Sequence, residues 1–211
     1  MFSMLFEQPT LIDNEQQLRE LFKTDRLSLG ASSTVVFEGL ITLGSEILFS
    51  GDCILGSETS IGNGCILTSV ILGIKNKVRP YSIVSNLTAG SSNLFGPFCF
   101  IRDECEVADN CILGSHVETA RSVFASGVKI SHHAFVGDAI IGERTIIGAG
   151  VVFCNYDGHS RQVTTVESDV TIGSGVLLVA PIFIGENSLI AAGSVVTKDV
   201  PKYEKIIQKL Q

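Results

Sequence analysis

Basic residues are scarce in this chain of 211 residues, which carries 15 Lys and Arg against 22 Asp and Glu and has a formal net charge of −7. No cluster of Lys and Arg offers the positive surface that a polynucleotide requires. No apolar run approaches the roughly 18 residues of a membrane-spanning helix, and the apolar stretch 1–6 is short and lacks a basic flank. We therefore expect an unexported, cytoplasmic protein with neither a nucleic-acid partner nor a membrane partner.

What the chain has is a hydrophobic residue at every sixth position over most of its length. The period runs through residues 43–67, 72–84, 95–113, 141–153 and 166–196. Neither the 3.6-residue period of a helix nor the two-residue alternation of a long strand produces this spacing. Three hexads that close one triangular turn of about 18 residues do produce it. Glycine often follows the apolar residue, as at Gly56 and Gly114, and glycine suits the corners of such a turn.

The repeat predicts an all-β fold, a parallel β-helix of hexapeptide repeats with about nine coils between residues 35 and 200. Residues 1–34 are expected to cap the first coil, with Asp13 or Asn14 starting a short helix over residues 15–23. Pro201 ends the pattern, and residues 203–210 are expected to form a second short helix within the segment 201–211. A short helix at each end would cover the open edges of the coil.

The six cysteines contain no CxxC pair, and five of them share the fifth position of the hexad, where the side chain must fit a narrow interior. These five are Cys53, Cys65, Cys99, Cys105 and Cys111. Small buried thiols need no partner, so we predict that they pack in the core and form neither a disulfide nor a metal site. Cys154 lies outside this set.

Two interruptions of the period carry polar residues. Between Phe153 and Val166 the step is 13 residues, which is enough for a loop that contains the sequence CNYDGHSR over residues 154–161. Between Leu113 and Ile141 the spacing becomes irregular. That second stretch contains Glu118, Arg121, His132 and His133. Because the regular positions of a repeat are committed to packing, functional residues are expected at these two interruptions.

Several segments resemble a known family. They are Gly96-Pro97-Phe98 with Arg102, Gly114 to Glu118, Val136-Gly137-Asp138, Ile147 to Gly150, Cys154 to Gly158, Val179-Ala180-Pro181 and Ala191 to Gly193. Over residues 40–200 the chain resembles the left-handed β-helix acetyltransferase domain of the bifunctional N-acetylglucosamine-1-phosphate uridyltransferase family. The resemblance implies a left-handed coil, a homotrimer, and acetyl transfer from acetyl-CoA to the amino group of glucosamine-1-phosphate, a step in UDP-N-acetylglucosamine biosynthesis. No Gly-rich nucleotide-binding loop lies near residue 1, so uridyl transfer is not predicted.

The resemblance assigns roles to individual residues. His132 aligns with the general base and Glu118 with the carboxylate that orients it; a histidine suits this task because its pKa lies near neutrality. The implied acceptor contacts are Arg102 and Arg161 to the phosphate, Asn155 to the sugar, and Tyr156 beside it. The implied contacts to acetyl-CoA are Ala149, Ser174, Ala192 and Lys209.

Three positions depart from the family's acceptor site. Ala120 stands where the family has a phosphate-binding lysine, Phe135 replaces a tyrosine and Ile146 replaces an asparagine. Each lost polar contact costs about 1 to 3 kcal/mol of acceptor binding. Two alternatives to the leading hypothesis therefore remain open. One is an acyltransferase with a changed acceptor, and the other is a β-helix with a non-catalytic or assembly role.

The three other histidines are expected in the loop and in the coil. His159, in the loop, is the rival to His132 as general base, because other hexapeptide acyltransferases use a loop histidine. His116 and His133 are interpreted as a packing residue and a corner residue.

Overall fold

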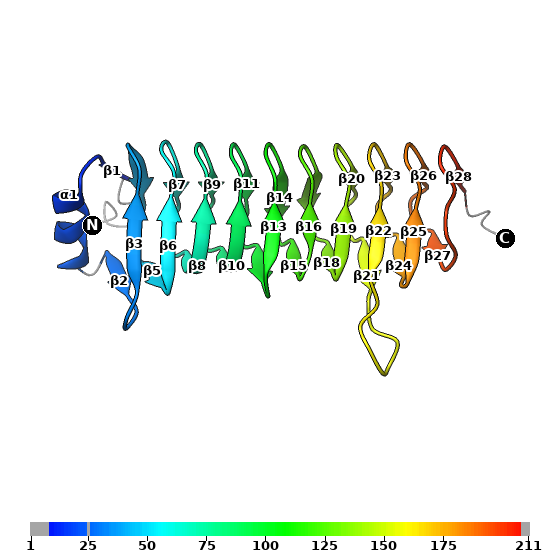
Figure 1. Ribbon diagram of the computed structural model, residues 1–211, viewed down its shortest axis with the longest axis horizontal. Helices are drawn as coiled ribbons and strands as arrows, with labels where there is room; N and C mark the ends of the chain where they lie inside the picture. Colours follow the sequence, from blue (N-terminus) through cyan, green and yellow to red (C-terminus); the bar gives the residue numbers. More distant parts are fainter. Residues whose placement is uncertain (1–8, 25, 208–211) are drawn as a thin grey trace, which may run out of the picture.

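The chain winds into a long three-sided prism, with residues 9–24 at one end of the prism axis and residues 205–207 at the other (Figure 1). The computed structural model describes residues 9–24 and 26–207. As the chain advances toward its C-terminus it climbs through the near strands and returns behind them, so the coil is left-handed (Figure 1). The predicted all-β fold, a left-handed parallel β-helix, is therefore confirmed.

The first face is an 11-stranded sheet in which β1 runs antiparallel to β4 and every later pair is parallel. Each strand after β1 adds one turn, which gives about ten coils in the described residues. Nine of these strands, from β4 to β26, lie between residues 35 and 200, the range for which about nine coils were predicted. The strands of this face are β1 (Thr10–Ile12), β4 (Ile41–Leu43), β7 (Ser60–Ile61), β9 (Lys77–Val78), β11 (Leu94–Phe95), β14 (Ile112–Ser115), β17 (Lys129–His132), β20 (Ile146–Ile147), β23 (Thr171–Ile172), β26 (Leu189–Ile190) and β28 (Lys205–Ile206).

Two seven-residue strands, β8 (Ile66–Leu72) and β10 (Ile83–Ala89), bend at a corner and contribute to both remaining faces. The rest of the second face is β2 (Leu27–Leu29), β5 (Ile47–Ser50), β12 (Phe100–Arg102), β15 (Glu118–Ala120), β18 (Phe135–Gly137), β21 (Val152–Cys154), β24 (Leu177–Val179) and β27 (Val195–Val196). The rest of the third face is β3 (Thr34–Phe37), β6 (Asp52–Leu55), β13 (Cys105–Val107), β16 (Val123–Phe124), β19 (Ala139–Ile141), β22 (Thr164–Val166) and β25 (Ile182–Ile184).

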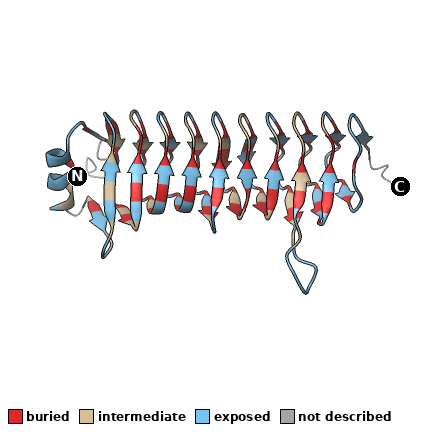
Figure 2. Cartoon of the chain, in the orientation of Figure 1, coloured by how far each residue is buried: buried red, intermediate tan, exposed pale blue. Residues whose placement is uncertain are grey.

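The core is the interior of the prism, where apolar residues from successive turns stack in register. One such column contains Phe49, Leu67, Val84 and Ile101, each paired with the next along the second face. Side chains alternate between this interior and the outer faces, as the bands of buried and exposed residues show (Figure 2). The five cysteines of the hexad's fifth position are buried free thiols, as predicted, and Cys154 is partly exposed.

Turns of 17 and of 18 residues both occur along the coil. In-register partners lie 18 residues apart between Thr34 and Asp52 but 17 residues apart between Arg121 and Asp138. The irregular spacing between Leu113 and Ile141 reflects these shorter turns, because β14 to β19 pair without a break. The other interruption does leave the prism, as the yellow loop between β21 and β22 shows (Figure 1).

The two ends of the coil differ from each other. At the N-terminal end α1 (Glu15–Phe22) forms where a helix was expected, and the Asn14 side chain accepts a hydrogen bond from the Gln17 backbone N–H at 3.0 Å. Leu18 is the buried residue of α1 and packs with the core of the prism. The helix expected over residues 203–210 is wrong for the part that the structure describes. Residues 205–206 form β28 instead, and residues 208–211 lie outside the described residues.

No helix in the described residues is long and apolar enough to cross a bilayer.

Candidate functional site

A ladder of polar side chains follows one corner of the prism at the level of β12 to β21. Asp103, Arg121 and Asp138 occupy equivalent corner positions on successive turns, and each has a positive φ between 50° and 57°. The Arg121 Nε and Nη2 atoms donate to the two carboxylate oxygens of Asp138 at 2.7 and 3.0 Å. Its Nη1 atom donates to Asp103 at 2.6 Å. Arg121 therefore bridges three consecutive turns through charge-assisted hydrogen bonds.

The carboxylate of Asp138 also holds the start of the extruded loop, because the Asn155 side-chain amide donates a hydrogen bond to Asp138 Oδ2. The Asp138 side chain is only 12% exposed. Burial acts to raise its pKa, but the hydrogen bonds from Arg121 and Asn155 and the charges of Arg121 and Arg161 outweigh that effect, so the pKa lies below its ordinary value.

Arg102 is the last residue of β12 and directly precedes Asp103 in the sequence. Its guanidinium donates hydrogen bonds to two carboxylates. Its Nη2 atom donates to Glu118 Oε1 at 2.9 Å, and its Nη1 atom donates to Asp103. The hydrogen bond to Glu118 is the main reason that the pKa of Arg102 is raised. The guanidinium also lies 5.5 Å from the centre of the Phe100 ring. Glu118 is therefore held by Arg102 in this structure.

His132 stands at the end of β17 on the first face, where it pairs with Ser115. Three residues later the chain reaches Phe135, which pairs with Glu118 on the second face. Within the described residues no hydrogen bond joins His132 to Glu118. The two proposed partners therefore lie on opposite sides of one corner, and the Glu118 carboxylate accepts from Arg102 instead.

The extruded loop is a compact hairpin with its own hydrogen bonds. Tyr156 and Arg161 form an antiparallel bridge. Asp157 Oδ1 accepts hydrogen bonds from the backbone N–H groups of His159 and Ser160, both at 2.8 Å. Asp157 Oδ2 accepts a hydrogen bond from the Gln162 side-chain amide at 2.9 Å. These hydrogen bonds lower the pKa of Asp157 to about 2. The loop is therefore shaped before any ligand binds.

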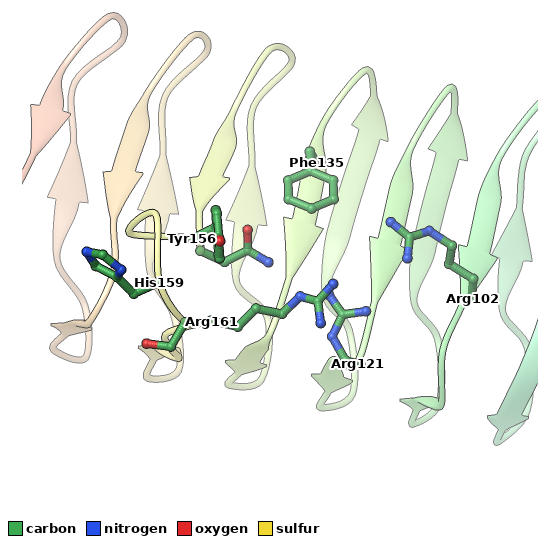
Figure 3. Close-up of a pocket in the computed structure, with 8 residues that line it drawn as sticks. Arg102, Arg121, Phe135, Tyr156, His159 and Arg161 are labelled. Atoms are coloured by element: carbon green, nitrogen blue, oxygen red, sulfur yellow. The ribbon is translucent and has the colours of Figure 1, made fainter.

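The loop and the ladder border an open cavity of about 530 Å³, shown in Figure 3. It is lined by Arg102, Arg121, Phe135, Asn155, Tyr156, His159, Ser160 and Arg161. Four residues expected at the acceptor site thus meet here, whereas Glu118 reaches it only through Arg102. Arg161 makes no ion pair within the described residues, which leaves its donors free. A cavity with three guanidinium groups around it is suited to an anion.

A second feature begins beside His132, along the corner between the first and second faces. Ala149, Ser174 and Ala192 follow His132 at equivalent places on the next three turns, two residues beyond Ile147, Ile172 and Ile190. Each of the three small residues is followed by a glycine with positive φ. A Cβ added at Gly175 or Gly193 would meet nothing within 4 Å. The result is a shelf, formed by residues 149–150, 174–175 and 192–193, that is bare of large side chains.

The opposite stretch of the same corner is covered by stacked rings. Tyr81, Phe98, His116 and His133 stack in that order, with ring centroids 5.6, 5.2 and 4.7 Å apart. His133 ends the stack next to the bare shelf. His116 and His133 therefore pack against rings at a corner, and the Nδ1 atom of His116 also shares a hydrogen bond with the Ser115 hydroxyl.

The structure adds Arg121 and Asp138 to the residues of the site. Arg121 lines the cavity, and Asp138 binds both Arg121 and Asn155. Their one-turn separation is visible in the sequence once the turn is known to be 17 residues. Lys209, expected at the coenzyme, lies outside the described residues. Among the residues that the structure describes, no group of three His, Cys, Asp or Glu side chains is placed to hold a metal ion.

Comparison with known proteins finds close relatives for part of the chain. It is 52% identical over 88 residues to the bifunctional protein GlmU of Geotalea daltonii, and 50% identical over 88 residues to that of Heliobacterium modesticaldum. Each match covers 42% of this chain and 19% of the relative. The chain thus matches about a fifth of the length of these curated relatives. The resemblance inferred from the sequence motifs is confirmed over that part.

Among solved structures, LpxA from Acinetobacter baumannii is similar over 83% of this chain and 69% of its own, with 16% identity and a TM-score of 0.48. No family model matches the chain.

Proposed function

We propose that this chain, being homologous to GlmU over 88 residues, is an acyl-CoA-dependent acyltransferase that moves an acetyl group from acetyl-CoA to the amino group of a sugar phosphate such as glucosamine-1-phosphate. The observation that carries the proposal is the cavity in which Arg102, Arg121 and Arg161 surround Asn155 and Tyr156. Three guanidinium groups beside an amide and a phenol suit an acceptor that has a phosphate at one end and hydroxyl groups at the other.

On the acceptor side, Arg161 and Arg102 bind the phosphate and Asn155 positions the sugar. Within the described residues the guanidinium of Arg161 is in no ion pair, which supports its role because it can form a bidentate pair with the phosphate. Arg102 gives up a carboxylate when the phosphate arrives, since both of its terminal nitrogens are engaged in this structure. Ala120 is fully buried and adds no polar contact to the cavity.

In the chemical step the acceptor nitrogen attacks the thioester carbonyl, a C–N bond forms and the C–S bond breaks. His132 takes the proton that the amine loses, and the coenzyme thiolate leaves with the bonding electrons and is protonated. Glu118, once released from Arg102, stabilises the imidazolium of His132. The bare shelf supports the donor side, because Ala149, Ser174 and Ala192 leave room along the corner for the extended arm of acetyl-CoA.

A homotrimer places this cavity at a cleft between subunits. An outward column on the second face supports the assembly. Ile83 and Phe100 lie at one end of this column and Leu177 and Val195 at the other, and all four are 37–46% exposed. Glu118, Phe135 and Val152 lie between the two pairs. Three-fold packing would bury such a stripe and bring the loop of one subunit against its neighbour. Sedimentation equilibrium at micromolar concentration should give three times the mass of the chain. We place the protein in the cytoplasm, where acetyl-CoA is available.

The test is a thiol-release assay with acetyl-CoA and glucosamine-1-phosphate. His132→Ala should lower kcat by a factor of about 10² to 10⁴, the usual contribution of a general base. His133→Ala is the matched control, because it alters the neighbouring ring at the same corner and should leave kcat within a few-fold. Full activity of His132→Ala in the purified assembly would contradict the assignment, and loss of activity in His159→Ala would transfer the role to the loop.

The same assay run with a panel of amino sugars and nucleotide sugars separates the alternatives. Turnover with glucosamine-1-phosphate supports the leading proposal, and turnover with a different amine alone identifies a changed acceptor. Binding of coenzyme A without turnover on any acceptor would favour the non-catalytic role.

A further inference from the structure

The loop that carries Asn155 and Arg161 is tied to the prism by a hydrogen bond from Asn155 to the partly buried carboxylate of Asp138. We propose that Asp138 is a positioning residue for the acceptor site, and that it fixes Asn155 directly and Arg161 through its charge. The inference rests on the proposed function, because it concerns how these two side chains are held ready for an anionic acceptor. It adds a residue that makes no contact with the substrate.

Three hydrogen bonds converge on the Asp138 carboxylate from two different segments. Two come from the Arg121 guanidinium on the preceding turn, at 2.7 and 3.0 Å, and the third comes from the Asn155 side-chain amide one turn further on. The carboxylate therefore fixes the orientation of the Asn155 amide, since an amide N–H that points to Asp138 turns the amide oxygen away from it. That oxygen is then available to accept a hydrogen bond from a sugar hydroxyl.

The charge of Asp138 matters as much as its geometry. Arg121 and Arg161 both line the cavity, and Figure 3 shows their side chains extending toward the same place. Both guanidinium charges act on Asp138. With the carboxylate present, one negative charge stands between two positive ones. Without it the two guanidinium groups repel each other across a partly buried space, and Arg161 moves away with its loop.

The fold contains a matched pair at another corner. The Arg144 Nε and Nη2 atoms donate to the two carboxylate oxygens of Asp169, both at 2.7 Å, in the same fork arrangement across one turn. Within the described residues neither side chain forms a hydrogen bond or ion pair with the extruded loop, and neither residue lines the cavity of Figure 3. Removing the charge of Asp169 thus measures what a corner Arg–Asp pair contributes to the coil, without the link to Asn155.

Asp138→Asn and Asp169→Asn are therefore compared in two measurements. The first follows trypsin cleavage of the peptide bond after Arg161 by mass spectrometry, which reports loop order and needs no catalysis. We expect cleavage in Asp138→Asn to be about tenfold faster than in the wild type, and in Asp169→Asn to be unchanged, because the variant loses a charge-assisted hydrogen bond and the neutralising charge. The second is steady-state kinetics, in which KM for the sugar phosphate should rise about tenfold in Asp138→Asn while KM for acetyl-CoA stays unchanged.

Arg121→Lys provides a second variant that keeps the positive charge and loses the fork, in case Asp138→Asn fails to fold. It should show the same two changes to a smaller degree. Wild-type rates of cleavage after Arg161 in both variants would overturn the proposal, and so would an equal rise in KM for both substrates, which indicates general loosening. Absence of any acetyl transfer by the wild type would instead refute the proposed function, and the cleavage comparison would still decide the role of Asp138.

Discussion

At the residue scale, the cysteines should divide into one reactive thiol and five inert ones. Burial raises the pKa of Cys99 to about 11 and also raises the pKa of Cys53, Cys65, Cys105 and Cys111. A thiol reacts as its thiolate and needs access. Iodoacetamide at pH 8 should therefore alkylate Cys154, which is partly exposed, and should reach the other five only after unfolding. Peptide mass spectrometry checks this, and modification of Cys99 in the native protein as fast as Cys154 would contradict it.

The proximity of individual candidate residues was predictable where a motif fixed their place relative to the repeat, and their roles stay predictions. Arg102, Asn155, Tyr156 and Arg161 were expected at the acceptor, and all four line one cavity. The contact between Arg121 and Asp138 could not be expected from a uniform 18-residue turn, because a 17-residue turn shifts the register by one position. The pairing of Glu118 with Arg102 is a choice between rotamers, which a sequence does not encode in an obvious way.

At the scale of single elements, two glycines should respond to alanine in different ways. A Cβ at Gly114 in β14 would lie 2.1 Å from the backbone oxygen of Ser131, so the next turn must shift. Gly175 has a φ of +68° and open space around it. We expect Gly114→Ala to lower the free energy of unfolding by at least about 1 to 3 kcal/mol. Gly175→Ala should lower it by about 1 kcal/mol, because alanine is strained in the left-handed backbone conformation.

Gly175→Ala should also change the kinetics with acetyl-CoA. Because the added methyl group of Gly175→Ala would stand on the bare shelf, KM for acetyl-CoA should rise while KM for the acceptor stays the same. Thermal unfolding and steady-state assays measure both quantities. An unchanged KM for acetyl-CoA would show that the coenzyme does not use the shelf.

The loop should keep its shape well into the acid range. The hydrogen bonds that Asp157 accepts from backbone N–H groups lower its pKa to about 2. The ordinary pKa of an aspartate is about 3.9. Its contribution to loop stability is therefore fully present above about pH 4 and is lost as the pH falls toward 2. The carboxyl carbon chemical shift of Asp157, followed by NMR from pH 6 to pH 3, should change by no more than about a tenth of its full titration range. A midpoint near pH 4 would contradict the hydrogen-bonded loop.

The ends of the coil show where local sequence signals failed. Within residues 203–210 the sequence has a helical pattern, but Lys205 and Ile206 form a strand instead. They pair in parallel with Leu189 and Ile190 and so continue the first face. At the other end parallel pairing already begins at Leu27, earlier than the boundary expected near residue 35. In both places an open edge of the sheet offers backbone hydrogen bonds that outweigh a weak helical or irregular preference.

At the scale of the whole molecule, the fold behaves as a stack in which each turn pairs mainly with the turns next to it. The hydrogen-bonded neighbours on the first face follow one another in chain order from β4 to β28, so each strand pairs with the strands of the turns just before and just after it. Stability in such a stack is close to a sum of turns and their interfaces, so a local defect should stay local. The N-terminal end depends on α1, whereas the cavity lies in the middle of the coil, between β12 and the loop after β21.

Leu18→Ala tests this independence. Leu18 is 3% exposed, and α1 packs against β2 and β1, so the truncation should cost about 2 to 4 kcal/mol at that end. Hydrogen exchange measured by mass spectrometry should become faster in β2 and β5, while β20 to β26 keep wild-type protection. Phe153→Ala is the matched change beside the cavity and should accelerate exchange in β18 to β24 and raise KM for the acceptor. A uniform acceleration along the chain in Leu18→Ala would instead mean that the prism opens as one cooperative unit, and then a substitution at either end would also weaken the acceptor site.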